Sequence, residues 1–137
     1  MLNINTETGL KCFSINNDEN KVILFNPADV NIISRLKKAS EELSLLAEDT
    51  KPSDDIDVVV TELERLDGEI RRQMDCIFDY PVSDIVFGAT SPMATIKGVP
   101  YFERFLNAVL PVLEQEMKDE YKAMEKRLGK YTEKYKK

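Results

Sequence analysis

Hydrophobic residues near the start of the chain form two short runs, and from residue 30 onward they recur at helical spacing. The runs occupy residues 11–15 and 21–25, and the five residues between them are Asn16, Asn17, Asp18, Glu19 and Asn20. Because asparagine and aspartate favour turns, this pattern predicts a β-hairpin within residues 10–25 with a five-residue loop. A lone hairpin is marginally stable in water, so we expect it to pack on helices or to pair with a strand of another chain.

Two helices are predicted next, at about residues 27–48 and 55–79. Asn26 is a favourable N-cap before Pro27, and Phe25 and Val30 have the spacing of a hydrophobic staple. The loop between the helices contains Pro52, which ends the first pattern. The apolar positions that define the two helices are Val30, Ile33, Leu36, Leu43 and Leu46 in the first, and Ile56, Val59, Leu63, Leu66, Ile70, Met74 and Ile77 in the second.

An irregular connection is predicted at residues 80–100, because two glycines and two prolines fall within its last thirteen residues. One or two helical turns are expected at residues 82–87. The last helix begins at about Tyr101 and contains Pro111. Proline lacks a backbone donor, so we expect a kink or a short break at this position.

The apolar stripe of the last helix narrows after Pro111, and its spacings alternate between four and three residues. Such a heptad seam matches one partner helix better than a broad core. We therefore predict that the seam contacts another protein chain, through Met117, Tyr121, Met124, Leu128, Tyr131 and Tyr135. The predicted fold is α+β and mostly α: a short N-terminal hairpin and three main helices form a domain over residues 1–115, and residues 116–137 form a helical arm continuous with the last helix.

Charge is distributed unevenly over a chain whose net charge is −6. Residues 126–137 hold six lysines and arginines against Glu133, a net of +5, so residues 1–125 carry −11. This asymmetry favours head-to-tail self-association or a partner of opposite sign, although lysines that complement a helix dipole explain it equally well. The acidic body argues against nucleic-acid binding, even though tyrosines among lysines in the arm are compatible with stacking on single strands.

Residues that carry common catalytic and metal chemistry are scarce. The chain has no histidine and no nucleotide-binding glycine motif. The acidic run at residues 54–57 lacks the glycine and closing glutamate of a calcium loop, so we expect neither a metal nor a cofactor. We interpret Cys12 and Cys76 as reduced, partly buried thiols. There is no run of eighteen apolar residues and no secretory signal pattern, so we expect neither a membrane span nor export.

Two segments carry a resemblance to known proteins. Residues 25–43, FNPADVNIISRLKKASEEL, resemble the start of the first helix in small phage and prophage proteins of Gram-positive bacteria. Residues 84–113, DIVFGATSPMATIKGVPYFERFLNAVLPVL, resemble their later segment, in which a Phe-Gly pair, a Ser-Pro pair and a glycine turn precede the last helix. In this order the two segments resemble the tail assembly chaperones of long-tailed phages.

The resemblance implies a non-catalytic protein that coats the tape-measure protein, recruits tail-tube subunits and leaves before the virion is complete. It implies action in the cytoplasm of the bacterial host and assembly into a homo-oligomer, and it leaves open a longer form made by ribosomal frameshifting. Two alternatives remain: another phage-encoded interaction protein, such as a scaffold-like or head–tail factor, or an acidic inhibitor of a host nucleic-acid-binding system.

Overall fold

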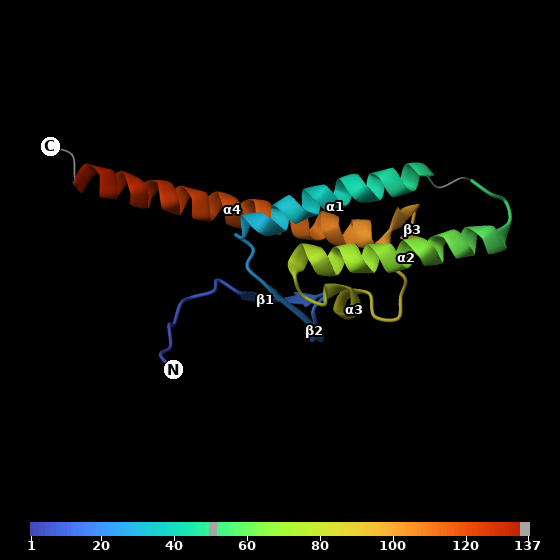
Figure 1. Cartoon of the computed structure of the whole chain (residues 1–137), viewed down its shortest axis with the longest axis horizontal. Coiled ribbons are helices and arrows are strands. Elements are labelled where there is room, and N and C mark those ends of the chain that lie inside the picture. The colour runs from blue at the N-terminus through green and yellow to red at the C-terminus, as the bar shows by residue number, and fades with distance from the viewer. Residues whose placement is uncertain (50–51, 135–137) are drawn as a thin grey trace.

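The computed structural model describes residues 1–49 and 52–134, with side-chain surroundings given except at residues 44, 47–49 and 130–134. The fold is α+β and mostly α, as predicted: an N-terminal hairpin is followed by helices, the last of them long (Figure 1). In chain order the elements are β1 (Lys11–Ile15), β2 (Asp18–Phe25), α1 (Val30–Asp49), α2 (Ile56–Phe78), α3 (Val82–Val86), β3 (Thr95–Ile96), β4 (Val99–Pro100) and α4 (Tyr101–Lys134).

The N-terminal hairpin turns more tightly than predicted. Asn16 and Asn17 alone form its turn, with φ angles of 53° and 59°. Two consecutive left-handed residues make the turn type whose twist matches that of paired strands, and asparagine tolerates this conformation. The predicted five-residue loop is therefore wrong, because β2 already begins at Asp18. An irregular register between Ser14 and Ile15 accommodates the extra residues in β2.

Helix α1 begins three residues later than predicted. The Asn26 side chain accepts a hydrogen bond from the Ala28 amide at 2.9 Å, and this closes a turn before the helix. The Asp29 carboxylate accepts a bond from the Asn31 amide at 2.9 Å, so Asp29 acts as the N-cap. Because the helix begins here, Val30 is exposed, and this excludes the predicted hydrophobic staple between Phe25 and Val30. Ile32, two residues further on, is buried in the core instead.

Helix α2 has clear boundaries at both ends. The Asp55 carboxylate accepts a bond from the Asp57 amide at 3.0 Å, and Asp79 closes the helix in the left-handed conformation. The Asp75 carboxylate of α2 then accepts bonds from the Ser83 amide at 2.8 Å and the Ser83 hydroxyl at 3.0 Å. These bonds fix the short helix α3 against the C-terminal end of α2.

Helix α4 runs without interruption through Pro111, so the predicted short break is wrong, while the kink stays a prediction. The irregular segment before α4 contains the two-residue pair β3–β4, whose turn has Lys97 and Gly98 in the left-handed region. The Phe102 amide donates to the Pro92 carbonyl at 3.0 Å, and this bond ties the start of α4 to the preceding loop.

Among the described residues, one hydrophobic core joins the hairpin, the helices and the loop after α3. Aromatic rings connect these elements: Phe13 stacks on Phe25 with centroids 4.5 Å apart, Phe25 meets Phe78, and Phe78 meets Phe105. The fully buried Met74 and Leu113 bring the C-terminal part of α2 and the first half of α4 into the same cluster. Figure 1 shows α1 on one side of this body, the hairpin and α3 on the other, and the C-terminal part of α4 extending beyond it.

Candidate protein-interaction surface

Most residues of the predicted seam lie on the part of α4 that extends beyond the core, shown in red in Figure 1. Tyr121, Met124 and Leu128 are 58%, 48% and 53% exposed, and Met117 is partly buried. Tyr131 belongs to α4, but its side chain and all of Tyr135 lie outside the described part of the chain. We refer to Met117, Tyr121, Met124 and Leu128 as the arm seam.

The arm seam forms one continuous stripe. An α-helix turns by about 100° per residue, so the four side chains fall within an arc of about 60°. Their backbone positions span about 16 Å along the helix axis. The core-facing Phe105 and Val109 of the same helix point a quarter turn or more away from the centre of this stripe, whereas the buried Leu113 lies about 50° from it. The arm seam therefore adjoins the core-facing side of α4 and extends beyond it.

A groove between α1 and α4 adds a second apolar surface, which the spacing of apolar residues within one helix does not predict. Its volume is about 730 Å³. We call it the α1–α4 groove, and it is lined by Ile33, Leu36, Lys37, Ser40, Glu41 and Leu43 of α1 and by Phe102, Glu103, Leu106, Asn107, Leu110 and Glu114 of α4. Its two walls are about seventy residues apart in the chain, so only the packing of the helices reveals it.

The groove and the arm seam lie on the same side of α4. Leu106 and Leu110 line the groove and fall within the same 60° arc as the arm seam. From Leu106 to Leu128 this apolar strip is about 33 Å long. Alpha1 covers one flank of the strip within the body, and beyond the body the strip is exposed (Figure 1). A partner helix could therefore pack along one continuous apolar strip.

Charged residues lie along the edges of this apolar strip. Lys37, Glu41, Glu103 and Glu114 line the groove, so its rim is mainly acidic. On another side of α4, Lys11 forms an ion pair with Glu116 at 3.0 Å, which joins β1 to the start of the arm. The Lys11 side chain is exposed and the Glu116 side chain is partly exposed, so the pair contributes at most about 1 kcal/mol.

Cysteines and acidic residues are the other side chains in the described residues that we considered for metal binding or reactivity. Among residues 1–49 and 52–134 no group of three or more histidine, cysteine or acidic residues is placed to hold a metal ion. Cys12 and Cys76 are free thiols, and both are exposed, so the expectation that they are partly buried is wrong. Hydrogen bonds from Arg72 and Gln73 lower the pKa of Glu69 from its ordinary value, as expected for a surface ion pair.

No helix in the described residues is long and apolar enough to span a bilayer. Comparison of the chain with protein-family models, with curated proteins and with solved structures finds no match.

Proposed function

We propose that this chain is a non-catalytic protein-binding factor of the tail assembly chaperone class, which binds a helical segment of the tape-measure protein. The observation that carries the proposal is the exposed arm seam, which continues the α1–α4 groove along one face of α4. An amphipathic helix that lies in an apolar groove is a common mode of protein recognition.

The free energy available from covering the arm seam indicates that it would act together with the α1–α4 groove. Tyr121, Met124 and Leu128 are each about half exposed, so covering them contributes about 1 kcal/mol per side chain. About 3 kcal/mol does not offset the loss of translational and rotational freedom on association. Burial of the groove residues, such as Leu106 and Leu110, must therefore contribute to affinity. The arm seam would extend and orient a contact that begins in the groove.

The resemblance of the two sequence segments and the position of the α1–α4 groove together support the tail assembly chaperone class. The segments at residues 25–43 and 84–113 include most of α1 and the first part of α4, the two helices that form the groove. In this proposal the chain coats the tape-measure protein in the cytoplasm of the bacterial host, recruits tail-tube subunits, and is absent from the finished virion.

The test uses paired substitutions in the arm. Met124→Asp with Leu128→Asp places two charges in the seam, whereas Ala123→Asp places a single charge on another face. We expect the double variant to lose binding to the tape-measure protein of the same genome, measured by light-scattering mass of the mixture. Ala123→Asp should bind like the unmodified chain, and circular dichroism should show that both variants are folded. A complex of unchanged mass with the double variant would contradict the proposal.

A second candidate function follows from the acidic end of α2. Residues 52–67 hold six acidic residues against Arg65, a net of −5, which is compatible with an inhibitor that imitates nucleic acid. Its binding to a basic host protein would weaken steeply with salt and would not need the arm seam. Binding that survives the double arm variant but is lost at about 0.5 M salt would favour this alternative.

A further inference from the structure

The N-terminal half of α2 carries a second exposed apolar stripe, formed by Ile56, Val60 and Leu63. These side chains are 69%, 44% and 37% exposed. Their spacings of four and three residues place them on one face of the helix, in the same pattern as the arm seam. We call these three residues the tip stripe. It lies at the opposite end of the molecule from the arm (Figure 1).

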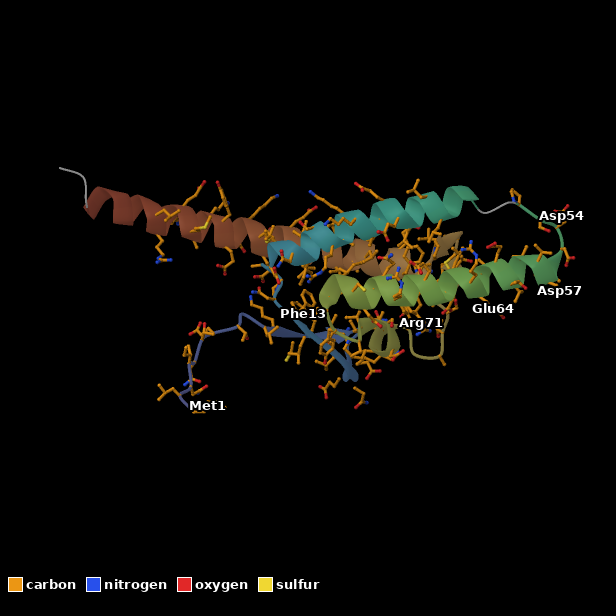
Figure 2. The ribbon with its side chains drawn as sticks, viewed as in Figure 1. Met1, Phe13, Asp54, Asp57, Glu64 and Arg71 are labelled. Atoms are coloured by element: carbon orange, nitrogen blue, oxygen red, sulfur yellow. The ribbon has the colours of Figure 1, made fainter. Side chains whose placement is uncertain are left out.

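Acidic side chains flank the tip stripe. Asp57 and Glu64 directly follow Ile56 and Leu63, so they lie seven residues apart along one edge of the stripe. Figure 2 shows Asp54 and Asp57 at the outer end of α2 and Glu64 further along the helix. Within the described part of the chain, neither the Asp57 nor the Glu64 carboxylate takes part in an ion pair, whereas Glu62 pairs with Arg65 at 2.9 Å.

The arm has the opposite charge. Residues 126–137 carry +5, against −5 for residues 52–67. Arg127 directly precedes Leu128, which places a cation at an edge of the arm seam. In Figure 1 the arm points away from the tip stripe of its own molecule, so the two stripes meet only between molecules.

We propose that the arm of one copy packs on the tip stripe of the next copy, in a head-to-tail contact. The proposal rests on the proposed function in so far as it uses the same arm seam, and the tape-measure protein would compete with the neighbouring copy for that seam. Because the two surfaces of the contact differ, a copy whose arm is bound still has its tip stripe free, and the assembly grows into a ring or an open filament.

Charge favours this occupant over a parallel pair of arms. Two arms packed in parallel would bring +5 against +5, whereas arm on tip pairs +5 with −5. The contact places Arg127 beside the carboxylates that flank the tip stripe, where opposite charges favour association and correct orientation. The apolar stripes supply burial at matching heptad spacing.

The test uses two variants, one in which the tip stripe is disrupted and one in which the arm seam is disrupted. The tip variant is Val60→Asp with Leu63→Asp, and the arm variant is Met124→Asp with Leu128→Asp; all four positions are exposed, so the fold should be kept. We expect the unmodified chain to increase in light-scattering mass with concentration, and each variant alone to remain a monomer. A mixture of the two variants should form a dimer and nothing larger, because one arm and one tip remain intact.

Self-association of the tip variant alone at the level of the unmodified chain would overturn the proposal, since it would mean that arms pack on arms. A monomeric unmodified chain at all concentrations would also overturn it. Charge gives an independent measurement: Asp57→Lys with Glu64→Lys should weaken association by about tenfold or more, and an unchanged affinity would contradict the pairing.

The same variants separate this inference from the proposed function. The tip variant keeps its arm and groove, so it should bind the tape-measure protein normally. If the unmodified chain binds that protein but never self-associates, the head-to-tail contact is wrong and the proposed function stands. If the arm variant still binds the tape-measure protein, the proposed function is wrong, and the mixing experiment decides the contact by itself.

Discussion

Leu113 and Leu128 lie on the same helix, yet they should respond very differently to replacement by alanine. Leu113 is 0% exposed in the core and Leu128 is 53% exposed on the arm. Removing a buried leucine side chain costs its transfer free energy and leaves a cavity, typically about 2–5 kcal/mol. An exposed position away from special features changes the free energy of unfolding by no more than about 0.5 kcal/mol. Against a total stability of about 5–15 kcal/mol, only the first change is large.

Urea unfolding followed by circular dichroism measures both effects. The protein must be dilute, because any association through the arm adds to the apparent stability. We expect Leu113→Ala to lower the free energy of unfolding by about 3 kcal/mol, and Leu128→Ala to leave it within about 0.5 kcal/mol. A loss of more than about 1.5 kcal/mol for Leu128→Ala in dilute solution would refute the reasoning, because it would place the arm seam in the core of the same molecule.

Three further predictions concern the body. Ser83→Ala should destabilise the fold by about 1–3 kcal/mol in urea unfolding, because Ser83 is buried and its hydroxyl donates to the Asp75 carboxylate. Asn17→Gly should raise the thermal midpoint, with a gain of about 0.5 kcal/mol, because φ at this position is 59° and glycine adopts it freely; a lower midpoint would argue against the two-residue turn. In an NMR titration Glu69 should show a pKa below the ordinary glutamate value, and Arg72→Ala should raise it. Since the folded-state pKa is the lower one, the small stabilisation is present above the ordinary value and is lost as the pH falls through the folded-state value.

The bounds of the elements were predicted well where the apolar periodicity is strong. They were predicted less well where a side-chain cap determines the residue at which a helix begins. Alpha2 spans Ile56–Phe78 against a prediction of about 55–79, because its apolar stripe is regular and Asp55 is a clear N-cap. At α1 two residues, Asn26 and Asp29, can both act as caps, and the structure uses Asp29. In the hairpin, the number of asparagines did not reveal which pair would take the left-handed conformation.

The candidate surface was only half predictable for a related reason. The arm seam follows from one helix alone, since the spacing of Met117, Tyr121, Met124 and Leu128 defines a face. The α1–α4 groove depends on how two distant helices pack, and helix periodicity does not fix that contact. Exposure also divides the apolar side of α2, where the tip stripe near the N-terminal end is accessible, whereas Leu66, Ile70 and Met74 further along the same side are buried.

Hydrogen exchange along α4 tests most directly whether the arm seam is a binding surface for another chain. In a dilute solution of the chain alone, amides at residues 117–128 should exchange far faster than those at residues 105–113, because only the latter segment belongs to the core. Addition of the tape-measure protein should slow exchange at residues 117–128 by about tenfold or more. Equal protection of the two segments without a partner, or no change when the tape-measure protein is added, would contradict the account.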